Sequence, residues 1–115
     1  MNHSRSNTKF GRQKKQRTAL LRTLAVSLIT YEKIETTLPK AKALRPFVER
    51  FLTRAKTGTI AVRRDITAVI GYEPTKKLVE TIAPKYKTRN GGYLRITKLN
   101  DRKSDGSAMA QIEFV

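Results

Sequence analysis

The chain has 115 residues, a length typical of one domain, and carries 25 Lys and Arg against nine Asp and Glu, a formal net charge of +16. It has no cysteine, which excludes disulfides, thiolate metal sites and thiol catalysis, and no apolar run approaches the roughly 18 residues of a membrane span. The charge indicates a polyanionic partner. Nucleic acid is favoured over an anionic membrane, because there is no Trp and the most basic segment is polar throughout.

The N-terminal segment is basic and free of acids as far as Glu32. Residues 1–13 contain almost nothing apolar beyond Phe10, so they cannot bury enough surface to order themselves. We therefore predict an extended basic arm over residues 1–13 and a single folded domain over residues 14–115. The polyanion contacts of this region are predicted at His3, Arg5, Lys9, Arg12, Lys14, Lys15, Arg17 and Arg22.

The first half of the domain is predicted to hold a helix, a strand and a second helix. After residue 14, apolar side chains recur at helical spacing, at Leu20, Leu21, Leu24, Ala25, Leu28 and Ile29. Residues 33–38 alternate between polar and apolar, which is typical of a strand. Pro39 opens a second helix that Gly58 ends, and Pro46 inside it should kink the first turns or delay the regular helix.

The second half is predicted to add two helices and a hairpin. Thr59 can cap a third helix that Gly71 stops, and Glu73 with Pro74 opens a short fourth helix that Pro84 closes. Residues 93–99 and 108–115 read as strands joined by the turn-rich residues 101–107. The order helix, strand, three helices, two strands predicts a two-layer α+β fold, with the helices packed on one face of a small mixed sheet.

A second basic region surrounds a double glycine. Basic residues alternate here with two tyrosines; Gly-Gly lets a backbone approach phosphate closely, and Tyr offers a stacking face or a hydroxyl donor. The alternative is a plain turn entering a strand, with Tyr93 as half-buried core. The residues of this predicted contact region are Lys85, Lys87, Arg89, Gly91, Gly92, Tyr93, Arg95, Lys98, Arg102 and Lys103.

Catalytic groups are scarce. The only histidine, His3, lies in the arm, where nothing fixes its geometry. The acid pairs Glu32 with Glu35 and Asp101 with Asp105 do not resemble a buried dyad or a metal-binding carboxylate cluster. We therefore expect no enzyme activity, no metal, no cofactor and no small-molecule substrate.

Several segments together resemble one known family. They are the basic arm with Gly11 and Arg12, RTALLRTLA at residues 17–25, IETTLPKAKALR at 34–45, AKT at 55–57, RNGGYLRI at 89–96 and MAQIEFV at 109–115. Over nearly its full length the chain resembles the bacterial ribosomal protein L17 family of the large subunit. The sequence of the arm differs from the family's usual opening at residues 2–10. This difference affects which residues of the arm make contacts, and it leaves the implied role of the arm unchanged.

The resemblance implies a two-layer fold with the same order of elements, a place in the large ribosomal subunit and binding to 23S ribosomal RNA. It also implies that the arm and the Gly-Gly-Tyr region lie against that RNA, with other large-subunit proteins as neighbours. The expected location is the cytoplasm, in the ribosome. A free-standing nucleoid or regulatory protein is the alternative, although the sequence lacks heptads and a recognisable base-reading helix.

Overall fold

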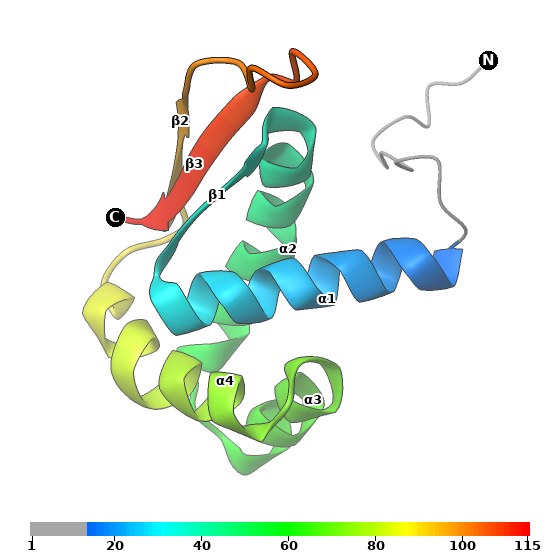
Figure 1. The fold of residues 1–115 in the computed structure, drawn as a ribbon. Helices are drawn as coiled ribbons and strands as arrows, with labels where there is room; N and C mark the ends of the chain where they lie inside the picture. The colour runs from blue at the N-terminus through cyan, green and yellow to red at the C-terminus, as the bar shows by residue number, and fades with distance from the viewer. Residues whose placement is uncertain (1–13) are drawn as a thin grey trace, which may run out of the picture.

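A computed structural model describes residues 14–115 of the chain. The elements in order are α1 (Lys14–Tyr31), β1 (Lys33–Thr37), α2 (Leu38–Ala55), α3 (Ile60–Ile70), α4 (Tyr72–Lys77), β2 (Leu94–Lys98) and β3 (Met109–Phe114). A π-helical segment (Leu78–Ile82) and a 3-10 turn (Ala83–Tyr86) continue α4 without a break. The predicted α+β fold and its order of elements are confirmed (Figure 1).

The sheet is antiparallel throughout, in the order β1-β3-β2, rather than mixed as we expected. The β2–β3 hairpin makes those two strands antiparallel. Strands β1 and β2 run in the same direction. Because β3 lies between them, these two parallel strands do not pair with each other. The hairpin turn closes through two short bonds, from the Arg102 N–H to the Ser107 carbonyl and from the Gly106 N–H to the Arg102 carbonyl, both 2.8 Å.

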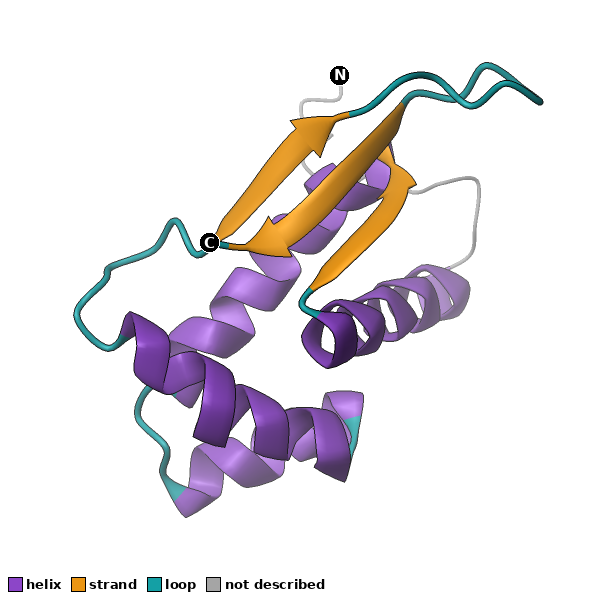
Figure 2. Cartoon of the chain, turned by 60° about the vertical axis from the view of Figure 1, so that its left-hand side comes forward, coloured by secondary structure: helices purple, strands orange, loops and turns teal. Residues whose placement is uncertain are grey.

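The strand register separates a buried sheet face from an open one. Ile34, Ile112 and Ile96 lie in one row across the three strands, on the face that the helices cover. The neighbouring row, Lys33, Glu113 and Arg95, points to the opposite face because successive side chains alternate. Figure 2 shows the helices gathered on one side of the sheet, as predicted.

The core lies between the sheet and the helices. Its fully buried members come from α1, α2, α3, the π-helical segment and the sheet: Ala25, Leu28, Ile29, Leu44, Val48, Leu52, Ile66, Leu78, Ile82 and Ile112. In α1 only the second half is buried, and Leu20 and Leu21 in the first half remain half-exposed. The N-terminal end of α1 accordingly extends past the other helices (Figure 1).

Glu32 joins α1 to β1 in a left-handed conformation, with φ of 64°. This backbone costs a non-glycine residue about 1–2 kcal/mol. Its N–H donates to the Leu28 carbonyl at 2.6 Å, which ends the helix, and its carbonyl accepts the Phe114 N–H at 3.2 Å. Its carboxylate lies 3.2 Å from Lys77 and 3.7 Å from Lys85, so the junction is held from α4 and the 3-10 turn.

The late helix start considered for Pro46 and the helix stop predicted at Pro84 are both wrong. Helix α2 is already regular at Leu38 and runs through Pro46 without a break, so it does not start late; Pro46 is exposed. Pro84 does not close the helical segment, because it lies in the first turn of the 3-10 turn and that turn runs on to Tyr86. The loop that follows therefore begins at Lys87, and Lys85 of the predicted contact region lies in the 3-10 turn.

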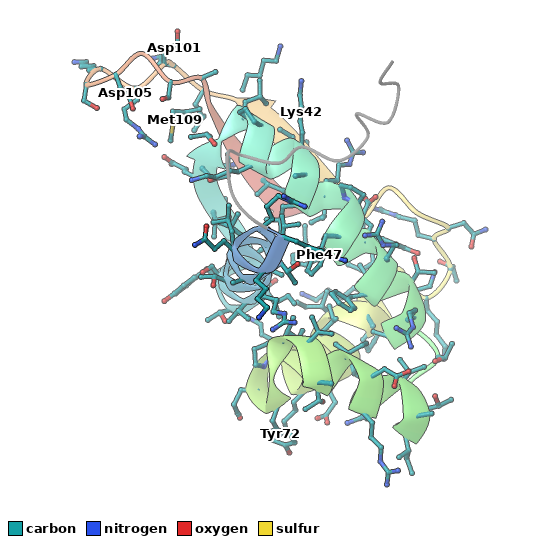
Figure 3. The ribbon with its side chains drawn as sticks, turned by 90° about the vertical axis from the view of Figure 1, so that its right-hand side faces the viewer. Lys42, Phe47, Tyr72, Asp101, Asp105 and Met109 are labelled. Carbon is teal, nitrogen blue, oxygen red and sulfur yellow. The ribbon has the colours of Figure 1, made fainter. Side chains whose placement is uncertain are left out.

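The cap of α3 is as predicted. Thr59 has an extended backbone, and its hydroxyl accepts the Val62 N–H at 3.3 Å. Gly71, with φ of 92°, ends the helix. Figure 3 shows the two ends of the molecule, with Tyr72 at the start of α4 and with Asp101 and Asp105 in the hairpin turn.

Candidate nucleic-acid interface

The exposed end of α1 concentrates positive charge. Lys14, Lys15 and Arg22 are exposed and, with Thr18, line a shallow concavity of about 400 Å³. Arg17 is half-buried beside them. The helix contains no acid, and Lys14, Lys15 and Arg22 have no ion pair with any residue in the part of the chain that the structure describes. The structure therefore brings these predicted residues together on one projecting surface.

Four predicted contact residues, His3, Arg5, Lys9 and Arg12, lie outside the described residues. The chain enters α1 at Lys14, so the arm joins the basic end of that helix directly.

The second predicted region does not form one patch. Residues 87–92 form a loop at the end of the sheet where β2 begins, whereas Arg102 and Lys103 lie in the hairpin turn at the other end (Figure 1). Lys98 is exposed at the end of β2. The predicted residues thus occupy both ends of the hairpin, separated by the length of β2.

Several cations of this region already have acidic partners. Lys85 lies 3.7 Å from Glu32, Arg95 lies 3.0 Å from Glu113 on the open face of the sheet, and Arg102 lies 3.3 Å from Asp105. These cations remain 44–61% exposed, so each pair is worth less than about 1 kcal/mol and can exchange a carboxylate for a phosphate. Lys87, Lys98 and Lys103 have no ion pair within residues 14–115.

Tyr93 is part of the core, with 1% of its surface exposed. Its ring meets Tyr86 edge-on at 5.3 Å between centroids, so no face is open for a base to stack on. Its hydroxyl accepts a hydrogen bond from Lys56 Nζ at 2.8 Å and donates to the Arg89 carbonyl at 3.2 Å. Tyr93 is therefore a core residue, as in the alternative interpretation, and is more deeply buried than the half-buried side chain expected there.

The double glycine is required by backbone conformation. Gly91 and Gly92 have φ of 87° and 66°, the left-handed region that side chains disfavour. A Cβ at either position would meet no atom of residues 14–115 within 4 Å apart from its chain neighbours. The turn is therefore open to its surroundings, and Arg89 stays beside it by stacking on the Tyr86 ring at 5.3 Å and donating to the Gly92 carbonyl at 3.3 Å.

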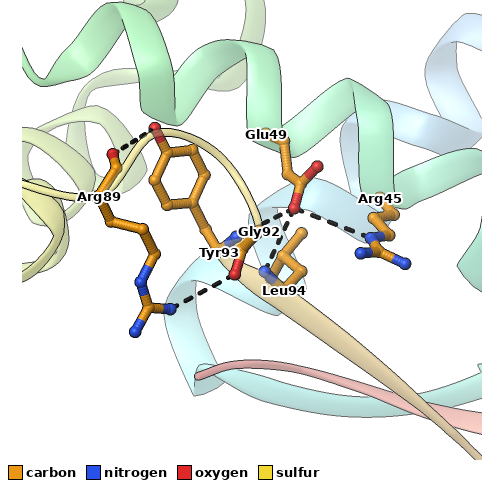
Figure 4. Close-up of polar contacts among 6 residues, drawn as sticks. All are labelled: Arg45, Glu49, Arg89, Gly92, Tyr93 and Leu94. Carbon is orange, nitrogen blue, oxygen red and sulfur yellow. Dashed lines mark hydrogen bonds and ion pairs between the residues drawn. The ribbon is translucent and has the colours of Figure 1, made fainter.

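Glu49 anchors the start of β2, a role that the sequence did not reveal. One carboxylate oxygen accepts the Tyr93 N–H at 3.1 Å and the Leu94 N–H at 3.3 Å, and lies 3.8 Å from Arg45 (Figure 4). The i,i+4 spacing of Arg45 and Glu49 indicates only a surface ion pair. No local signal points to the other two partners, which are 44 and 45 residues away.

Hydrogen bonds to the phenol oxygen lower the pKa of Tyr93 to about 8, chiefly the bond from Lys56 and secondly that from Thr53. We expect the phenolate absorbance of one tyrosine to appear with a midpoint near pH 8, and the Lys56→Met variant to lose this early titration. Because the folded-state pKa lies below the ordinary value near 10, this group should add stability as the pH rises from about 8 to about 10. A chain with no phenolate signal below about pH 10 would contradict the network.

Residues 14–115 meet neither the requirements of a metal site nor those of a membrane-spanning helix. These residues hold no group of three or more His, Cys, Asp or Glu side chains placed to bind a metal ion. None of their helices is long and apolar enough to cross a membrane.

Comparison with known proteins decides the family. The family model described as ribosomal protein L17 matches residues 20–115, which includes all of the sheet and most of α1. The chain belongs to the ribosomal protein L17 family. It is similar over its whole length to the large ribosomal subunit protein bL17 of Mesorhizobium japonicum, with 50% identity covering 81% of that relative. Its identity to the bL17 proteins of Campylobacter concisus and Agrobacterium fabrum is 49% and 47%, covering 98% and 82% of them.

The L17 family is a family of ribosomal proteins and not of enzymes, so the prediction of no catalytic role is confirmed. The match begins at residue 20, within α1, and takes in the Gly-Gly-Tyr segment. The alignments with the bL17 relatives also cover the arm and the first turns of α1.

Proposed function

We propose that this L17 chain is a structural protein of the large ribosomal subunit in the cytoplasm that binds 23S ribosomal RNA. In this proposal both the arm (residues 1–13) and the domain (residues 14–115) contact the RNA. The contacts are the predicted cations of the arm, of the end of α1 and of the two ends of the β2–β3 hairpin. Tyr93 and Gly92 contribute by positioning the loop, and other large-subunit proteins are neighbours.

One observation carries the proposal: the projecting end of α1 has no acid, and its three exposed cations, Lys14, Lys15 and Arg22, have no ion pair to residues 14–115. A cluster of like charges without counter-ions is unfavourable in the free protein, and phosphates relieve the repulsion while releasing their own counter-ions. The half-exposed Leu20 and Leu21 on the same part of the helix would also be covered in an assembly.

The neighbourhood of the cations favours phosphate contact over reading of base sequence. Lysines and exposed arginines at three separate places on a rigid domain can fix its position on folded RNA through the backbone. No tyrosine of the Gly-Gly-Tyr segment is available for stacking, because Tyr86 and Tyr93 are both buried. We therefore propose recognition by shape and charge.

The proposal is tested by sedimenting a lysate through a sucrose gradient at high magnesium and detecting the chain in each fraction. The chain should sediment with the large subunit and move to lighter fractions after ribonuclease treatment. Recovery of the chain free of large subunits would contradict the proposal and would support a free-standing nucleic-acid-binding protein instead.

A further inference from the structure

A groove of about 450 Å³ runs between α2 and the Gly-Gly turn. One wall is a stripe of α2 at helical spacing, made of Pro46, Glu49, Arg50, Thr53 and Arg54. Gly91 and Tyr93 form the opposite wall. The groove is open to solvent along its length, and its volume is within the range of small-molecule sites.

The glycine wall leaves room for a flat group. Gly91 has no side chain, and a Cβ on it would lie more than 4 Å from every atom of residues 14–115 outside its chain neighbours. A planar ligand can therefore lie directly against the backbone of the turn. The Tyr93 N–H donates to the Glu49 carboxylate at 3.1 Å. Because this bond joins the two walls, it fixes the width of the groove.

The helix wall provides carbon surface and positive charge. The Pro46 ring and the methylene stems of Arg50 and Arg54 are apolar, whereas the two guanidinium groups are planar cations that stack on bases and bind phosphate. Arg50 is exposed and has no ion pair within residues 14–115, while Arg54 pairs with Asp65 at 2.7 Å. The acid in the groove, Glu49, is already engaged by two backbone N–H groups and by Arg45.

We propose that this groove holds one unstacked nucleotide of the bound RNA, with the base between the Arg50 side of α2 and the Gly91 backbone and its phosphate on Arg50. The inference rests on the proposed function and adds a base-accepting subsite to it. A phosphate alone would need no carbon-lined groove, and a duplex could not enter one. A splayed base from a single-stranded bulge or loop provides both the flat apolar face and the negative charge.

The first experiment follows the backbone amides of the isotope-labelled full chain by NMR. Adenosine 5′-monophosphate should shift the amides of Thr53 and Gly91, whereas inorganic phosphate at equal ionic strength should leave them in place. If phosphate produced the same shifts, the groove would be an anion site only and the proposal would be overturned.

The second experiment measures the affinity of variants for a 23S ribosomal RNA fragment. Arg50→Ala should lower affinity about tenfold, within the range measured for loss of one stacked base. Arg50→Lys keeps the charge but loses the planar group, so it should lower affinity nearly as much. The matched control is Arg64→Ala on α3, an exposed arginine that has no ion pair within residues 14–115, which should stay within about twofold of the unchanged chain.

The outcomes separate this inference from the proposed function. A chain that binds no ribosomal RNA at all would refute the proposed function. Normal RNA binding with equal effects of Arg50→Ala and Arg64→Ala, or full affinity in Arg50→Lys, would overturn the groove alone. Groove amides that ignore nucleotides but stay protected in ribonuclease-treated large subunits would assign the groove to a protein neighbour and would also overturn it.

Discussion

Replacing Lys14, Lys15 and Arg22 together with alanine is expected to weaken binding to a 23S ribosomal RNA fragment about a hundredfold, at about 1 kcal/mol for each lost contact. The side chains are exposed on a part of α1 that lies outside the core, so the fold should be unaffected. The logarithmic salt dependence of affinity should become shallower by about 2–3, since each phosphate contact contributes about 0.7–0.9. Filter binding across a salt series measures both quantities.

A control with the same loss of charge distinguishes position from total charge. Lys33, Arg64 and Lys76 are exposed cations on β1, α3 and α4 that have no ion pair within residues 14–115. Their triple alanine variant should keep most of the affinity and nearly the full salt slope. Equal losses in the two variants would show that only the net charge matters, and would remove the end of α1 as a specific contact surface.

Glu49→Ala is expected to destabilise the domain by about 3 kcal/mol. The substitution leaves the N–H groups of Tyr93 and Leu94 without their acceptor, and each unsatisfied buried donor costs about 1–3 kcal/mol. Glu49→Gln retains a carbonyl oxygen at the same place, so it should cost about 1 kcal/mol. Urea denaturation measures the free energy of unfolding of both variants.

The matched control for Glu49 is Arg45→Ala. It removes the ion pair at 3.8 Å but leaves both backbone bonds, and because Arg45 is 46% exposed the loss should be below about 1 kcal/mol. If Glu49→Ala were no more harmful than Arg45→Ala, Glu49 would be a surface residue, and the loop at residues 87–92 would be held in place by other contacts.

Local patterns were sufficient to predict most of the fold. The spacing of Leu28 and Ile29 in α1, the Thr59 cap and the Gly71 stop of α3 depend on residues within a few positions of each other, and each prediction is confirmed. The prediction for Pro84 was wrong for the same reason: its local effect as a helix breaker is real, but the chain changes from π-helical to 3-10 geometry at Ala83 and stays helical to Tyr86.

The interior of the candidate site could not be predicted, because its contacts join distant segments. The positive φ of Gly91 and Gly92 is typical of their sequence, but the burial of Tyr93 depends on Lys56 and Glu49 of the α2 region. Arg54 pairs with Asp65 and Arg63 with Glu80, whereas the sequence placed Asp65 beside Arg63 and Arg64. Which cations remain unpaired is therefore a property of the tertiary structure.

We propose that particular cations of this L17 chain lie against ribosomal RNA, and lysine reactivity in intact large subunits tests this claim. Lys14, Lys15, Lys87, Lys98 and Lys103 should react with an amine-labelling reagent in the free chain, be protected in the subunit and become reactive again after ribonuclease digestion. Lys76, exposed on α4, provides the internal comparison and should react throughout. Full reactivity of the five lysines in the intact subunit would contradict the claim, as would protection that survives removal of the RNA.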